Sequence, residues 1–133
     1  MNLEKTLMNS LGIEIKELGK GKVIATMPVD ERTWQPFGLL HGGASVALAE
    51  TVASVGGFEL VNQSDEAVVG LEINANHIRG KRNGYVTAEG NILHRGKSTM
   101  VWDIKIRDEE ENLICVSRCT LAVIKRKKEQ ADQ

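Results

Sequence analysis

Cysteine is scarce in this chain, and its two cysteines are badly placed for a disulfide. Cys115 and Cys119 lie four residues apart in a run that alternates like a strand. Four residues of extended chain span about 13 Å, whereas a disulfide needs Cα atoms within about 7 Å of each other. The two thiols therefore cannot pair within that strand. We expect both to be small core side chains without a metal or redox role.

The chain also lacks a strong net charge and a long apolar run. Its formal net charge is −1, which argues against a nucleic-acid partner held by bulk positive charge. The uncharged stretch from Trp34 to Ala49 contains Pro36, His41 and three glycines, so it does not predict a membrane span. The first eleven residues carry Glu4 and Lys5 and do not look like a signal peptide. We expect a cytosolic protein.

The composition that remains is that of an ordinary globular protein. Hydrophobic residues make up 41% of the 133 residues, enough for one domain with its own core across residues 1–133. The last nine residues, 125–133, are charged and polar. We interpret them as a solvated tail.

The spacing of apolar residues predicts an α+β fold. A short amphipathic helix over Leu3–Leu11 and a hairpin that turns at Lys20 come first. A long helix follows, from Gly42 or Gly43 to about Leu60. Four alternating strands come last, over Ala67–Ile78, Gly84–Leu93, Lys97–Arg107 and Leu113–Lys125. Because strands joined by short turns pair antiparallel, we expect one antiparallel sheet and one long helix.

The long helix has no polar face, since alanine, valine and leucine occur all around it. A helix that is apolar on every side is buried on most sides. A single sheet covers only one side. We therefore expect a second subunit to cover part of the rest.

Glu50 is the only charged residue between Arg32 and Glu59, so it lies alone on this apolar helix. A carboxylate is costly to bury without a partner. One interpretation is a salt bridge to an arginine of a neighbouring element; the other is a general base or nucleophile. Ser54 lies one turn further on the same face, where its hydroxyl either orients the carboxylate or a water, or bonds the carbonyl four residues back.

His41, Gly42 and Gly43 begin the helix. The first N–H groups of a helix lack partners and carry partial positive charge, and glycines let a substrate approach them closely. Such a helix start can hold a carbonyl oxygen that becomes an oxyanion. Together with Gln35 and Glu50, it indicates a catalytic site.

One chain cannot complete this site by itself. Gly42 and Glu50 are eight residues apart, or about 12 Å along a helix axis, too far to act on one carbon atom. Two such helices packed antiparallel across a two-fold axis would bring Glu50 of each subunit to Gly42 of the other. We expect two shared sites in a homodimer.

Basic residues gather at two further places. His77, Arg79, Lys81 and Arg82 end one predicted strand, and a turn near them carries His94, Arg95 and Lys97. They form either a solvated rim or a landing zone for phosphates. The spacing of the three histidines matches no zinc motif, and no motif supports a Ser-His-Asp triad.

The stretch QPFGLLHGGASVALAETVAS, with VVGLEINANHIR, resembles the hotdog-fold acyl-CoA thioesterases of the 4-hydroxybenzoyl-CoA type. The nearest branch includes 1,4-dihydroxy-2-naphthoyl-CoA hydrolase and the proofreading thioesterase of enterobactin synthesis. The resemblance extends from about Leu11 to Ile124. It implies a sheet wrapped around a buried central helix, hydrolysis of an acyl-CoA thioester, a homotetramer built as a dimer of dimers, and no cofactor or metal.

The resemblance also implies a role for each site residue. Glu50 resembles the nucleophile or general base, Gly42 the oxyanion donor with His41 beside it, and Gln35 the residue that binds the substrate carbonyl or the water. Ser54 is similar to the hydroxyl that positions the water. The region implied to bind the CoA portion comprises His77, Arg79, His94, Arg95, Gly96 and Lys97.

Two other functions fit parts of the pattern. A hotdog hydratase or dehydratase needs a histidine and a carboxylate at one substrate carbon, which His41 and Glu50 could supply. A non-catalytic acyl-CoA-binding module would not need Glu50. For a thioesterase we expect an aromatic acyl group, such as 1,4-dihydroxy-2-naphthoyl or a benzoyl analogue, with room for a flat ring at Gly56 and Gly57.

Overall fold

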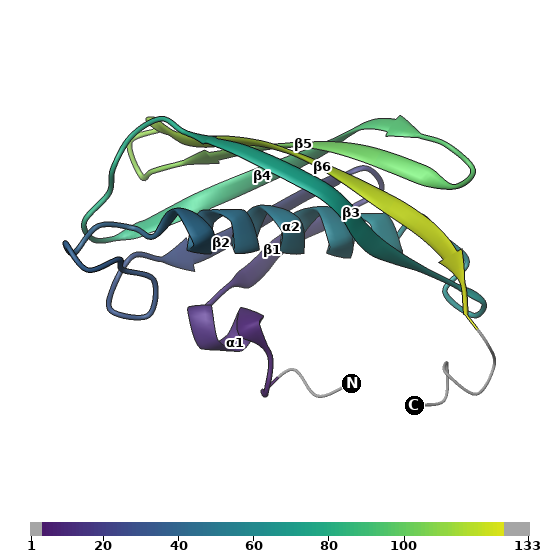
Figure 1. The fold of residues 1–133 in the computed structure, drawn as a ribbon, viewed down its shortest axis with the longest axis horizontal. Helices are drawn as coiled ribbons and strands as arrows, with labels where there is room; N and C mark the ends of the chain where they lie inside the picture. The colour runs from purple at the N-terminus through teal and green to yellow at the C-terminus, as the bar shows by residue number, and fades with distance from the viewer. Residues whose placement is uncertain (1–3, 127–133) are drawn as a thin grey trace.

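The structure, a computed structural model, describes residues 4–126 as six strands and two helices. The elements in chain order are α1 (Leu7–Leu11), β1 (Glu14–Gly19), β2 (Lys22–Pro28), α2 (Gly42–Phe58), β3 (Glu66–His77), β4 (Tyr85–Arg95), β5 (Thr99–Arg107) and β6 (Leu113–Lys125). The sheet curves over α2, which runs along its inner face (Figure 1). The predicted α+β fold, one antiparallel sheet wrapped around a long helix, is confirmed. Most of the predicted tail at 125–133, and Leu3, lie outside the described residues.

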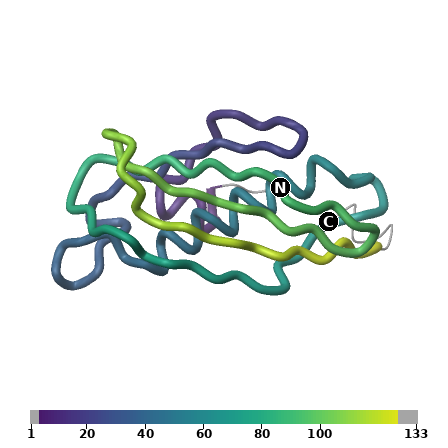
Figure 2. The backbone as a smooth tube through the Cα atoms, turned by 90° about the horizontal axis from the view of Figure 1, so that it is seen from above, coloured from purple at the N-terminus to yellow at the C-terminus, as the bar shows by residue number. Residues whose placement is uncertain are grey.

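The strand order is β1-β2-β4-β5-β6-β3, with every neighbouring pair antiparallel. The expectation that sequence neighbours pair through short turns is correct for the first hairpin and for β4 to β6. It is wrong for β3, which pairs with β6 and not with β4. Residues 78–84 instead carry the chain across the end of the sheet, as Figure 2 shows from above. Because the chain crosses the sheet in this way, β3 lies at one edge of the sheet.

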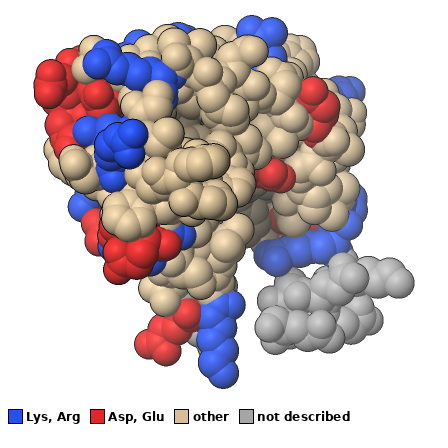
Figure 3. Space-filling model, turned by 60° about the vertical axis from the view of Figure 1, so that its left-hand side comes forward, with Lys and Arg blue, Asp and Glu red and all other residues tan. Residues whose placement is uncertain are grey.

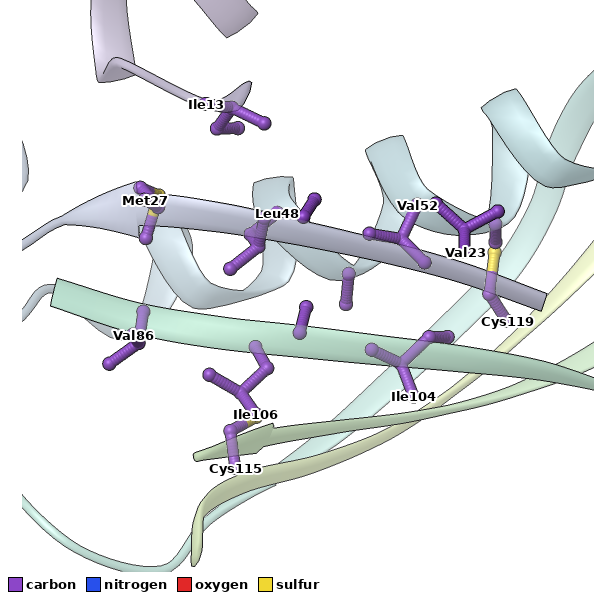
Figure 4. Packing of buried hydrophobic residues seen from close by; sticks show 14 of the residues in the cluster. Ile13, Val23, Met27, Leu48, Val52, Val86, Ile104, Ile106, Cys115 and Cys119 are labelled. Atoms are coloured by element: carbon purple, nitrogen blue, oxygen red, sulfur yellow. The ribbon is translucent and has the colours of Figure 1, made fainter. Parts of the chain in front are cut away.

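The core lies between α2 and the inner face of the sheet. Leu48 and Val52 of the helix face Val23, Ile104 and Cys119 of three different strands (Figure 4), and all five side chains are fully buried. Both cysteines are buried and unpaired, as predicted. Apolar side chains alternate along β5 because successive residues of a strand point to opposite faces.

Trp102 occupies the centre of this core with no exposed surface. A Cβ atom at Gly56 of α2 would overlap the indole ring, and one at Gly57 would lie 2.6 Å from Leu121 Cδ1. The space at these two glycines is therefore filled by core side chains. The expectation that they leave room for a flat ring of the substrate is wrong.

The opposite side of α2 is only partly covered. Short helix α1 lies beside it, capped by Thr6 and ended by Gly12 in the left-handed conformation. Val46, Ala47 and Val55 remain half-buried, so one sheet does cover only one side of this helix. No helix within residues 4–126 is long and apolar enough to cross a membrane.

Candidate active site

Hydrogen bonds at the start of α2 leave one N–H group free. His41 caps the helix: its Nδ1 accepts from the Gly43 N–H at 2.8 Å, and its carbonyl accepts from the N–H groups of Ala44 and Ser45. Within the described chain, the Gly42 N–H has no acceptor. A free N–H at a helix start is suited to bind a developing oxyanion.

Gln35 lies in the loop that precedes this helix, and its side chain is held in one orientation. Its Oε1 accepts the Phe37 N–H at 2.5 Å, and because only the oxygen of an amide can accept, this bond fixes which end is which. The Nε2 donors make no hydrogen bond within residues 4–126 and remain free for a ligand. Gln35, Gly42, His77 and Arg79 line one cavity of about 310 Å³.

His77 ends β3 on the helix side of the sheet and lies against Gly42. A Cβ atom at Gly42 would come within 2.8 Å of His77 Nε2. Arg79 follows it, and its exposed guanidinium makes no ion pair within the described part of the chain. Neighbouring Lys81, by contrast, is bound to Glu109 at 2.7 Å. Figure 3 views this end of the molecule, where basic and acidic atoms alternate around a largely uncharged surface.

Glu50 lines a second cavity, on the partly covered side of α2. This cavity measures about 470 Å³, and the side chains around Glu50 are mainly apolar: Leu7, Met8, Val46, Ala47 and Val55. The Glu50 carboxylate makes no hydrogen bond and no ion pair with residues 4–126. The alternative of a salt bridge to an arginine within the chain is therefore wrong. An unpaired carboxylate in an apolar cavity is a functional-site feature.

Ser54 lines the same cavity one turn beyond Glu50. Its hydroxyl has no bond to the carbonyl four residues back, so the structural alternative is not observed within the described residues. Thr51 makes that bond instead, from Oγ1 to the Ala47 carbonyl at 2.7 Å. The Ser54 hydroxyl is free to orient a carboxylate or a water.

The carboxylate of Glu50 also influences a core thiol on β6. Burial, followed in size by the negative charges of Glu50 and Glu72, raises the pKa of Cys119 to about 11. At neutral pH this thiol is uncharged. A nucleophilic role for Cys119 is not indicated.

The site residues thus fall into two groups that one chain does not join. Gln35, Gly42 and His77 meet in the first cavity, whereas Glu50 and Ser54 meet in the second. Helix α2 is regular from Gly42 to Phe58, so the separation of about 12 Å between Gly42 and Glu50 along its axis holds.

The second basic group is not near the first. The Arg95 guanidinium bonds the Leu60 carbonyl, just beyond the end of α2, while His77 lies at the beginning of that helix. The 17 residues of α2 span about 25 Å. The expectation that the turn with His94, Arg95 and Lys97 lies near His77 and Arg79 is therefore wrong within a chain. Strand β4 is 11 residues long, and it carries His94 to the far end of the sheet.

Sequence reasoning missed one residue of the site, Gly70 on β3. A Cβ atom there would overlap Glu50 Oε2 and lie 3.4 Å from the Glu50 carboxyl carbon. A glycine within an alternating strand signals a bulge or a close approach of another group. That signal was present in the sequence.

Comparison with known proteins identifies the family of this chain. Residues 37–115, more than half of the chain, match the model of the thioesterase superfamily. The chain belongs to this superfamily. The matched stretch includes Gly42, Glu50, Ser54, His77 and Arg79. It confirms the predicted family and the predicted thioesterase activity.

Relatives of known sequence and structure cover nearly all of this thioesterase. It is 53% identical to 1,4-dihydroxy-2-naphthoyl-CoA hydrolase of Listeria monocytogenes over 122 residues, which are 92% of this chain and 98% of that protein. It is 50% identical to the hydrolase of the same name from Escherichia coli over 121 residues, 91% and 88% of the two chains. A crystal structure of a thioesterase from Haemophilus influenzae superposes with a TM-score of 0.87 at 52% identity, covering 91% of this chain and 84% of that one.

Proposed function

We propose that this thioesterase hydrolyses aromatic acyl-CoA thioesters at sites shared by two subunits. The observation that carries the proposal is a pair of groups on α2 without a partner among residues 4–126: the N–H of Gly42 and the carboxylate of Glu50, in separate cavities. Each is half of a hydrolytic site. The relatives named 1,4-dihydroxy-2-naphthoyl-CoA hydrolase support a thioester with an aromatic acyl group.

The edge of the sheet at β3 supports a dimer in which the two half-sites meet. Strand β3 is 12 residues long and, among residues 4–126, pairs only with β6, so its other edge has no partner strand in that part of the chain. A long open edge is a template for pairing with another strand. Two β3 strands paired antiparallel across a two-fold axis would lay the two α2 helices side by side, antiparallel, with Glu50 of one near Gly42 of the other.

In such a site the Gly42 N–H donates a hydrogen bond to the thioester carbonyl oxygen, and Gln35 Nε2 donates to the carbonyl or to the water. Glu50 of the other subunit either removes a proton from a water, which adds to the carbonyl carbon, or adds to that carbon itself. The oxyanion of the tetrahedral intermediate remains hydrogen-bonded to the Gly42 N–H. The C–S bond then breaks, and CoA leaves as the thiolate and takes up a proton. If water has added, the acid is released directly; if Glu50 has added, a water first hydrolyses the mixed anhydride between Glu50 and the acyl group.

The apolar cavity around Glu50 supports an apolar or aromatic acyl group. We place the aromatic ring of the substrate among the side chains of this cavity, and no longer beside Gly56 and Gly57. Arg79, which has no ion pair in the described chain, is proposed to hold a phosphate of CoA. From the resemblance to the family, we further propose that the reaction takes place in the cytoplasm and that the enzyme is a homotetramer, built as a dimer of dimers.

The test of this function measures thiol release from a panel of acyl-CoA substrates. We expect kcat/KM to be higher for benzoyl-CoA and 1,4-dihydroxy-2-naphthoyl-CoA than for acetyl-CoA. A higher kcat/KM for acetyl-CoA would contradict the aromatic assignment. Single-turnover reactions in water labelled with heavy oxygen separate the two roles of Glu50, because only a nucleophilic carboxylate exchanges label into the enzyme.

A further inference from the structure

The residues of β3 that face α2 do not follow one alternation along the whole strand. Their positions shift by one residue between the first half and the second half. In a regular strand, residues an even number of positions apart share a face. Gly70 contacts Glu50 of the helix and His77 contacts Gly42 of the same helix, although seven positions separate Gly70 from His77. In an unbroken strand these two residues would point to opposite faces of the sheet.

A β-bulge resolves this difference. Gly70 pairs with Leu121 of β6, but Glu72 pairs with the next residue of β6, Thr120, so Leu71 is an extra residue in β3. Directly opposed residues share a face. Beyond the bulge, Ile73 is opposite Cys119 and His77 is opposite Cys115, and both cysteines are fully buried on the helix side. The bulge thus returns the second half of β3 to the helix.

Gly70 lies at the first position of this bulge, beneath the Glu50 carboxylate. Any Cβ atom at this position would overlap Glu50 Oε2 and would lie 3.4 Å from the carboxyl carbon and 4.0 Å from Cγ. The backbone of Gly70 is not in the left-handed region, so its conformation does not require glycine. Space for the carboxylate is the requirement that the structure shows.

We propose that Gly70 and the bulge after it are a positioning device for the active site: Gly70 seats the Glu50 carboxylate, and the bulge lets the same strand hold His77 against Gly42. Gly70 touches neither substrate nor water in this proposal and acts through Glu50. The inference rests on the proposed role of Glu50 in hydrolysis. One strand then sets the positions of both half-sites along α2.

An alanine at Gly70 can fill the space beneath the Glu50 carboxylate without disturbing the fold. An alanine methyl at Gly70 meets the end of a flexible side chain rather than backbone, so the carboxylate moves and the strand stays. A misplacement of about 1 Å in a reacting group can cost roughly a hundredfold in rate. We expect Gly70→Ala to lower kcat by about 10- to 100-fold, with KM changed by less than about twofold.

The matched control is Gly19→Ala. Gly19 ends β1, and a Cβ atom there meets only the Lys22 carbonyl oxygen, at an ordinary 3.5 Å. This variant makes the same chemical change in a strand far from Glu50, and we expect wild-type kcat. Native mass spectrometry of both variants, at the concentration used for kinetics, checks that the oligomer matches that of the wild type.

A double variant distinguishes a seat from a general structural role. Glu50→Asp withdraws the carboxylate by one methylene and lowers kcat by itself. If Gly70 acts only through that carboxylate, Gly70→Ala adds at most about threefold to the loss of Glu50→Asp, because the shorter side chain already avoids the methyl group. Losses that multiply in the double variant, or a Gly70→Ala enzyme with wild-type kcat, would overturn the proposal.

A crystal structure of Gly70→Ala tests the seat without any activity. The Glu50 carboxylate should leave the surface of β3, while the bulge and the contact of His77 with Gly42 remain. A carboxylate that keeps its place beside Ala at that position overturns the seat, whatever the kinetics show. Conversely, wild-type activity in Glu50→Ala would reject the catalytic role of Glu50 and leave the seat to be judged from the crystal structure.

Discussion

The imidazole of His77, at the end of β3, lies directly against the Cα of Gly42, the first residue of α2, with room for no methyl group between them. This contact joins the helix start to the end of β3, two residues before Arg79, whose guanidinium makes no ion pair within residues 4–126. Position 42 therefore requires glycine for two reasons. A side chain there would collide with His77, and it would also obstruct the approach of a substrate.

Gly42→Ala tests this contact. Alanine keeps the backbone N–H, but its methyl group would lie 2.8 Å from His77 Nε2 and would displace the ring. We expect a loss of kcat/KM of about tenfold or more, since the methyl group also narrows the approach to the N–H. Gly80→Ala is the control, because its Cβ meets Leu39 at an ordinary 3.6 Å in the same cavity. Equal activity of the two variants would contradict this role of Gly42.

Glu50→Ala should lower kcat by about 10²- to 10⁴-fold and leave the fold intact. Removal of a carboxylate that has no partner within the described residues should keep the melting temperature or raise it. Glu59→Ala, which changes the acidic residue at the end of the same helix, should retain wild-type kcat. Thiol release and thermal unfolding of both variants are the measurements, and a wild-type rate in Glu50→Ala is the contrary result.

Mixed dimers test whether the sites are shared. One inactive variant carries Glu50→Ala; the other carries Gln35→Ala with Gly42→Pro, which removes the oxyanion N–H. After the two are unfolded together and refolded at equal concentration, about half of the dimers are mixed, and each mixed dimer has one intact site.

Activity of the mixture should recover to about a quarter of the wild-type value if the sites are independent. Each variant refolded alone is the control and should stay inactive. Native mass spectrometry reports whether mixed dimers form. If they form and the mixture stays as inactive as its parents, each site lies within one chain.

Neutralising Arg79 should weaken CoA binding more than catalysis. We expect Arg79→Gln to raise KM for CoA thioesters with a smaller effect on kcat, because a phosphate far from the reacting carbon contributes mostly uniform binding. A truncated thioester without the nucleotide should be insensitive to the change. Arg118→Gln, on the exposed part of β6, is the charge-matched control. Equal losses on both substrates would make Arg79 a structural residue.

The buried thiol of Cys119 predicts a pH dependence of stability. Its pKa is raised to about 11 in the folded chain, against a reference value of 9.0. Between these two values the unfolded chain has lost the thiol proton and the folded chain has kept it, so the free energy of unfolding falls as pH rises. Below pH 9 this contribution is fully present.

Urea unfolding at several pH values from 7 to about 11 measures this effect. Cys119→Ala should show a smaller fall in stability over the alkaline range than the wild type. The difference between the two curves isolates the thiol from lysine and tyrosine groups that titrate in the same range. Parallel curves would mean that Cys119 ionises as readily in the folded chain as in the unfolded one.

Local patterns in the sequence were enough to identify the long helix, its glycine start and the solitary Glu50. Each rests on a physical requirement that acts over a few residues: helical periodicity, the free N–H groups of a helix end, and the cost of an unpaired charge on an apolar face. The helix length also limits how far Gly42 and Glu50 lie apart. The expectation of a second subunit follows from that distance.

Only the tertiary structure decided which side chains meet across the sheet. Strand order depends on pairing between distant segments, so β3 lies beside β6, and His94 to Lys97 lie at the other end of the molecule from His77. The faces of Gly56 and Gly57 are occupied by Trp102 and Leu121, which no local pattern could reveal. The bulge after Gly70 has the same origin, because the register of a strand is set by its partner, and that register places Gly70 under Glu50.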